Sequence, residues 1–82
     1  MLKRYFCVTN AYNCVLFVDK KGEAVYIDEA AFDEPLTLEV AKAADYSQIE
    51  GYEDAATAAA NYCTGENLTK FDPDYFEEVI EF

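Results

Sequence analysis

The sequence KRYFCVTNAYNCVLFVDKKGEAVYID, residues 3–28, contains three short runs that are rich in Val, Phe, Tyr and Ile. These residue types favour β-strands, and the polar segments NAYN and KKG between the runs are typical of turns. Gly22 can adopt the positive φ that a tight hairpin turn requires. The middle run is apolar on both strand faces, as expected for a strand with a neighbour on each side. We therefore predict a three-stranded antiparallel meander whose first and third strands form the edges.

The middle of the chain changes to helical signals. Thr37 is a candidate N-cap, and apolar residues follow it at helical spacing, which predicts a first helix over residues 37–45. The segment DAATAAANYC, residues 54–63, is rich in alanine, the residue with the highest helix propensity. Asp54 can cap the start of this segment and Gly65 lies just beyond its last turn, so we predict a second helix there.

The C-terminal segment FDPDYFEEVIEF, residues 71–82, is predicted to form a third helix. Asp72 is a candidate N-cap, and Pro73 occupies the first helical position, where proline is favoured. At about 100° per residue the apolar and acidic side chains separate onto opposite sides, whereas a strand would mix both types on each face. The predicted fold class is α+β: a three-stranded antiparallel meander over about residues 3–28, then two or three short helices over about residues 36–82, packed on one face.

Length and composition indicate one small folded domain, residues 1–82, with a strong negative charge. Apolar residues make up 52% of the chain, which is enough to build a core. The net charge of -11 is unevenly distributed: residues 1–22 hold four basic groups against one acid, and residues 23–82 hold two against sixteen. Such a field repels nucleic acid and anionic membrane surfaces and favours a basic protein as partner.

Catalytic and metal-binding signatures are missing from the sequence. It contains no histidine and neither of the glycine-rich phosphate-binding motifs, so we expect no enzymatic activity and no cofactor. Cys7, Cys14 and Cys63 lack C-x-x-C spacing, and we predict reduced, structural cysteines and no metal site. Neither a signal peptide nor an apolar run of roughly 18 residues is present, which predicts a cytoplasmic protein without a membrane span.

Two acidic segments are candidates for partner binding, and the first is DYSQIEGYED, residues 45–54, which lacks Lys and Arg. Glu53 and Asp54 have a structural explanation, because anions are favourable at the start of a helix. Asp45 lies at the opposite, unfavourable end of the preceding helix, so a structural account of it requires solvation or a local cap. Glu50 is ambiguous, since it also completes an S-x-x-E capping pattern that Gly51 interrupts.

The second candidate is the acidic stripe of the expected C-terminal helix. At 1.5 Å per residue its four carboxylates span roughly 10 Å, about one charge per 3.5 Å, close to the phosphate spacing of roughly 3.4 Å along one DNA strand. A solvated, Glu-rich helix face is the alternative interpretation. Tyr46 and Tyr52 are either core residues or an aromatic contact surface. The candidate partner-binding residues are Asp45, Tyr46, Glu50, Tyr52, Asp74, Glu77, Glu78 and Glu81.

In size, charge and residue arrangements such as DYSQIEGYED and DPDYFEEVIEF, the chain resembles small acidic inhibitor proteins of mobile elements, notably anti-CRISPR and anti-restriction DNA mimics. The resemblance implies a non-enzymatic inhibitor that binds the basic nucleic-acid-binding groove of a nuclease or similar protein, without binding nucleic acid itself. An alternative is a small interaction or regulatory module, such as an antitoxin or assembly subunit, whose acidity only keeps it soluble. Homodimerisation through a sheet edge remains open.

Overall fold

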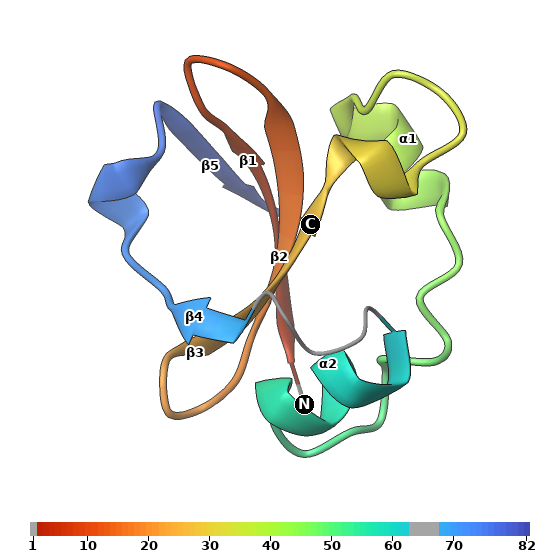
Figure 1. Cartoon of the computed structure of the whole chain (residues 1–82), viewed down its shortest axis with the longest axis vertical. Coiled ribbons are helices and arrows are strands. Elements are labelled where there is room, and N and C mark those ends of the chain that lie inside the picture. Colours follow the sequence, from red (N-terminus) through yellow and green to blue (C-terminus); the bar gives the residue numbers. More distant parts are fainter. Residues whose placement is uncertain (1, 63–67) are drawn as a thin grey trace.

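A computed structural model describes residues 2–62 and 68–82 and shows an α+β fold in which five antiparallel strands form one sheet (Figure 1). Two helices and two short 3₁₀ turns complete the described elements. In chain order they are β1 (Lys3–Val8), β2 (Asn13–Val18), β3 (Glu23–Asp28), η1 (Glu29–Ala31), α1 (Leu38–Ala43), α2 (Ala55–Tyr62), β4 (Leu68–Lys70), η2 (Pro73–Tyr75) and β5 (Glu78–Glu81).

The meander of β1, β2 and β3 is confirmed, with β2 between its two neighbours. Residues 14–18 of β2 are all buried, which explains why that run is apolar on both faces. Gly22 closes the β2–β3 turn with a φ of 83°. The prediction that β1 and β3 form the edges is wrong, because the strand order is β4-β3-β2-β1-β5.

Both internal helices are present, and each has the cap that its sequence indicates. The Thr37 hydroxyl accepts a hydrogen bond from the backbone N–H of Val40, and α1 ends at Ala43, two residues earlier than predicted. The Asp54 carboxylate accepts one from the N–H of Thr57 at the start of α2. The expected end of the second helix, including Cys63 and Gly65, lies outside the described residues.

The predicted C-terminal helix is wrong. Asp72 and Pro73 start only one 3₁₀ turn, and the chain then extends as β5 and pairs with β1. Extension is favoured because the edge of β1 offers backbone hydrogen-bonding groups, and because a strand places Val79 and Ile80 against different apolar clusters. These gains outweigh the helical periodicity of the segment, which is a local signal only.

The sheet is covered on both faces. On the helix face, Phe17 and Ile27 pack against small side chains of α1 and α2 such as Ala41 and Ala58. On the second face the buried residues are Cys7, Cys14, Leu16, Val18 and Ala24, and they are covered by aromatic side chains of the strands and of the β4–β5 connection. Figure 1 shows this connection on the side of the sheet opposite the helices. Each face of the sheet therefore has its own apolar cluster.

Candidate partner-binding surface

The strand register concentrates the basic residues of the chain at one end of the sheet. At one end, Lys3 of β1 pairs with Val18, and Lys70 of β4 pairs with Glu23. This basic end contains five of the six basic residues: Lys3, Arg4, Lys20, Lys21 and Lys70. At the other end, the pairs Val8–Glu78 and Cys14–Asp28 place the start of β5 and the end of β3 at the same end of the sheet, with β1 and β2 between them.

The connection between β3 and α1 adds further acidic residues at this end of the sheet. Asn13 at the start of β2 donates a 2.8 Å side-chain hydrogen bond to the carbonyl of Leu36, which holds the connection against the sheet. Figure 1 shows α1 beside the end where β5 begins and α2 toward the other end. A groove of about 490 Å³ between the connection and α1 is lined by four acidic residues and by no basic one. These four are Asp33, Glu34, Glu39 and Asp45.

We call this surface the acidic end and define it by eight exposed residues: Asp28, Glu29, Asp33, Glu34, Glu39, Asp45, Glu77 and Glu78. None of their carboxylates forms a salt bridge within the part of the chain that the structure describes. Lys42 on α1 is the one basic residue of the sequence between positions 22 and 69. The acidic end therefore presents negative charge that the protein itself leaves largely uncompensated.

Two cations of the basic end have intramolecular partners. The Arg4 guanidinium forms a 2.7 Å salt bridge with Glu50, and the Lys70 ammonium donates to the backbone carbonyl of Lys21. Asp19 is buried there and accepts hydrogen bonds from three backbone N–H groups. The molecule is thus electrostatically polar, because cations and acids are interspersed at this end, whereas the other end carries many acids and few cations.

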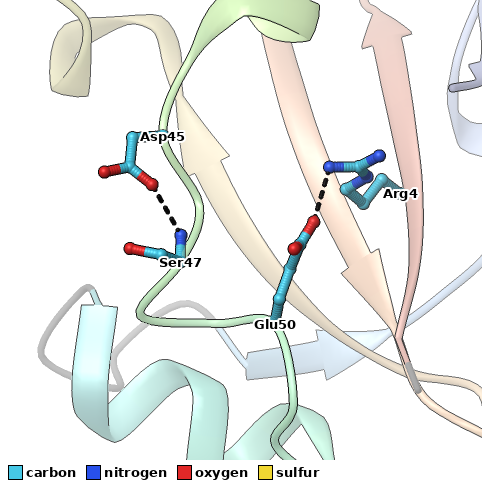
Figure 2. A network of polar contacts seen from close by, with 4 residues as sticks. All are labelled: Arg4, Asp45, Ser47 and Glu50. Atoms are coloured by element: carbon cyan, nitrogen blue, oxygen red, sulfur yellow. Dashed lines mark hydrogen bonds and ion pairs between the residues drawn. The ribbon is translucent and has the colours of Figure 1, made fainter.

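The acids of residues 45–54 have intramolecular partners that are not visible in the sequence. Figure 2 shows the Asp45 carboxylate accepting a 2.9 Å hydrogen bond from the N–H of Ser47. This bond and the Ser47 hydroxyl lower the pKa of Asp45, so the local cap that a structural account requires is present. The figure also shows Glu50 reaching across to Arg4 of β1, a residue 46 positions away. Glu50 lies at the basic end and is not an unpaired charge.

The two tyrosines of this segment have different surroundings. Tyr46 is only 3% exposed and its ring packs against Phe17, Tyr62 and Phe82, which favours the core role among its two interpretations. Burial, with a smaller effect of Tyr62, raises the pKa of Tyr46 to about 12. Tyr52 is half-buried, close to the start of α2 and away from the acidic end.

The Tyr46 hydroxyl is buried without a hydrogen-bond partner among the described residues, and this makes a testable prediction. We expect Tyr46→Phe to raise the free energy of unfolding by about 1 kcal/mol, because it removes a desolvated polar group and keeps the ring packing. Urea unfolding followed by circular dichroism measures this. Tyr26→Phe is the control and should lose stability, since the Tyr26 hydroxyl interacts with Cys14 and Tyr12. A clear loss of stability in Tyr46→Phe would show that the hydroxyl has a partner.

The acidic stripe of the expected C-terminal helix does not exist as one surface. Glu78 and Glu81 lie on opposite faces of β5, and Asp74 lies in η2. The backbone N–H of Glu77 donates to the carbonyl of Val8, which places Glu77 at the acidic end beside the start of β5. Of the four carboxylates, Glu77 and Glu78 belong to the acidic end, whereas Glu81 lies at the basic end opposite Tyr5.

Five residues of the acidic end were missed as candidates, although the sequence carries a signal for four of them. The segment DEAAFDEP, residues 28–35, contains four acids and no base. The fifth, Glu39, is explained locally by its position in the first turn of α1, where a negative charge is favourable. Their assembly into one surface depends on the strand register and is not visible in the sequence.

Carboxylates and thiols are the candidate metal ligands among the described residues, and Cys7 and Cys14 are the candidates for thiol chemistry. Within residues 2–62 and 68–82, no three His, Cys, Asp or Glu side chains lie close enough together to hold a metal ion. Cys7 and Cys14 are free, fully buried and paired across β1 and β2. The hydrogen bond with Cys14, together with burial, raises the pKa of Cys7, so its nucleophilic thiolate is disfavoured.

Comparisons with protein-family models, with curated proteins and with solved structures found no match to this chain. No helix in the described part of the chain has the length and apolar character needed to cross a bilayer.

Proposed function

We propose that this chain is a non-enzymatic inhibitor that binds a basic nucleic-acid-binding groove of a partner protein through its acidic end. The observation that carries the proposal is the uneven distribution of charge along the sheet: eight exposed carboxylates gather at one end, whereas five of the six cations lie at the other end among acids. A net charge of -11 attracts a basic partner, and this distribution orients the acidic end toward it.

The arrangement of the carboxylates fits the replacement of phosphates better than the binding of an ion. The acids of the groove come from α1, which contributes Glu39, and from the loops on either side of it, which contribute Asp33, Glu34 and Asp45, and they line an open hollow. In the proposed complex each carboxylate accepts hydrogen bonds from Lys or Arg side chains that otherwise bind successive phosphates. The bound protein then excludes nucleic acid from the groove.

The outer edge of β5 supports a complex with a different protein rather than with a second copy. Antiparallel pairing of two β5 edges would bring the glutamates Glu78 and Glu81 of both copies close together. Like charges at a strand edge oppose such pairing, a common protection against self-association. A monomeric chain that binds one partner is consistent with this edge.

The proposal is tested with purified CRISPR effector nucleases and restriction enzymes as candidate partners. We expect the chain to inhibit cleavage by its partner, to bind it more weakly as salt rises, and to be displaced by excess DNA or RNA. Equilibrium binding at several salt concentrations, with and without competing nucleic acid, measures the dependence on salt and the displacement. Affinity that is indifferent to salt and to competing nucleic acid would contradict the proposal.

The second candidate function, a small interaction or regulatory module such as an antitoxin or assembly subunit, is favoured by a different observation. Tyr75 is a large side chain that is 66% exposed, and it lies beside a hollow lined with aromatic residues on the second face. Binding through that face alone would be largely insensitive to salt. Such a result would favour this alternative.

A further inference from the structure

The second face of the sheet carries a hollow of about 360 Å³ that is lined mainly by aromatic rings. Its floor is the buried side chain of Leu16 on the central strand. The size is near the lower end of small-molecule sites, roughly 300 Å³, which suits one long side chain. The rings come from the β1–β2 turn, from β3 and from the β4–β5 connection: Tyr12, Tyr26, Phe71, Tyr75 and Phe76.

These rings are held by one another. Tyr12 and Tyr26 meet edge to face with their centroids 6.0 Å apart, and Tyr75 and Phe76 do so at 5.1 Å. Phe71 stacks on Tyr5 of β1, which fixes the wall of the hollow to the sheet. A ring surface that is already assembled needs little reorganisation when a ligand binds.

Two acids and one base lie around the hollow. Asp72 lines it, and Glu77 lines an adjoining hollow that shares Tyr12 and Tyr75 with the first. The aromatic hollow is therefore continuous with the acidic end. Lys70 also contributes to the lining, but its ammonium donates to the carbonyl of Lys21 and lies toward the basic end.

We propose that this aromatic hollow receives the guanidinium group of one arginine of the basic partner. This inference rests on the proposed function, which supplies a partner rich in Arg and Lys. Aromatic faces attract cations, and the planar guanidinium stacks on rings more readily than an ammonium does. Asp72 and Glu77 add an acidic rim that an uncharged side chain would not use.

With an arginine in the hollow, the protein imitates the bases of a nucleic acid as well as its phosphates. Arginine side chains of nucleic-acid-binding proteins stack on exposed bases while neighbouring cations bind phosphates. Here the exposed ring of Tyr75 takes the place of a base, and the carboxylates beside it take the place of phosphates. One partner groove can thereby contact both surfaces.

The hollow is tested directly by titrating the isotopically labelled protein with N-acetylarginine amide and recording NMR spectra. We expect saturable shifts of the ring signals of Tyr12, Tyr26 and Tyr75. The neutral isostere N-acetylcitrulline amide should bind at least fivefold more weakly. Equal shifts with citrulline amide or with N-acetylleucine amide would overturn the proposal, because the hollow would then be a general apolar site. Unsaturable or scattered shifts would also overturn it.

Substitutions at the exposed ring provide the matched comparison. Tyr75→Ala should lower the affinity for N-acetylarginine amide at least fivefold. Tyr75→Phe should retain the affinity, because the ring face remains. Tyr52→Ala is the control, since Tyr52 lines none of the hollows described above. An unchanged affinity in Tyr75→Ala, with amide spectra that show a folded protein, would contradict the assignment.

The failure of this inference is distinguishable from failure of the proposed function. If the partner complex depends on salt and nucleic acid but N-acetylarginine amide does not bind, the arginine assignment is wrong and the acidic end alone explains binding. If N-acetylarginine amide binds but the chain displaces nucleic acid from none of the nucleic-acid-binding proteins tested, the hollow is supported and the proposed function is contradicted.

Discussion

Asp19→Ala is expected to lower the free energy of unfolding by about 4 kcal/mol, since it removes hydrogen bonds from three backbone N–H groups to a buried carboxylate. Asp19 is 7% exposed. One of its oxygens accepts from Lys21 and Glu23 at 2.9 and 3.0 Å, which closes the β2–β3 turn. The other accepts from Ala55 at 3.1 Å and thereby attaches the first residue of α2 to the sheet.

The substitution leaves the buried N–H of Ala55 without a partner at the positive end of the α2 dipole. Urea unfolding measures the loss. Asp19→Asn should lose less, because its amide oxygen can still accept from the turn while its NH₂ group cannot accept from Ala55. Asp28→Ala is the matched control: its carboxylate is exposed and, among the described residues, accepts only from the N–H of Ala30, so we expect a loss near 1 kcal/mol. Equal losses in Asp19→Ala and Asp28→Ala would contradict this account.

The contribution of Asp19 should also depend on pH. Burial acts to raise the pKa of Asp19, but hydrogen bonds from Ala55, Glu23 and Lys21 outweigh it and hold the pKa below the ordinary value of 3.8. A carboxyl whose pKa is lower in the folded state contributes stability above its unfolded pKa and loses it as pH falls through the folded pKa. The stability difference between the native protein and Asp19→Asn should therefore be constant above about pH 5 and shrink below pH 4. A constant difference down to pH 3 would refute the assignment.

Neutralising three acids of the groove, in the variant D33N/E34Q/E39Q, is expected to weaken binding to the basic partner about 30-fold. The estimate takes three exposed ion pairs at about 0.7 kcal/mol each. Because these carboxylates have no salt-bridge partner in the described part of the chain, the variant should fold as well as the native protein or slightly better. Isothermal titration at low salt measures the affinity, and the dependence of affinity on salt should become shallower.

The control for this variant carries the same change of net charge at the basic end. Glu23 and Glu81 lie at strand ends near the cations, and Glu53 lines a hollow with Lys20 and Lys21. We expect E23Q/E53Q/E81Q to change the affinity less than threefold, since these residues do not face the partner. Similar losses in the two variants would show that only the total charge matters, and the acidic end would lose its assignment.

Local patterns predicted the parts of the fold that depend on neighbouring residues. Runs of β-forming residues separated by turns identified the meander, and side-chain caps identified the starts of α1 and α2. The C-terminal segment failed because β5 is specified by a partner more than 70 residues away: the pairing of Cys7 with Val79 is a tertiary contact. Short segments that mix acidic and apolar residues can suit either structure, and the open edge of β1 selects the strand.

The candidate site was predicted only in part, for the same reason. Asp45, Glu77 and Glu78 were identified and lie at the acidic end, but the sequence gives no indication that Glu50 reaches Arg4. The aromatic hollow was missed, because its residues are scattered from Tyr12 to Phe76 and only the β4–β5 connection brings them together. Composition indicated the chemistry of the surface, and the strand register determines where that chemistry is concentrated.

The most direct test of the central claim is a competition titration on the partner nuclease. A fluorescent DNA or RNA ligand is bound in the groove of the nuclease, and its anisotropy is followed as this chain is added at constant salt. We predict complete displacement, with a midpoint that shifts to higher concentration in proportion to the nucleic acid present and that rises about 30-fold for D33N/E34Q/E39Q. Formation of a ternary complex, in which the nuclease holds this chain and the nucleic acid at once, would contradict the claim.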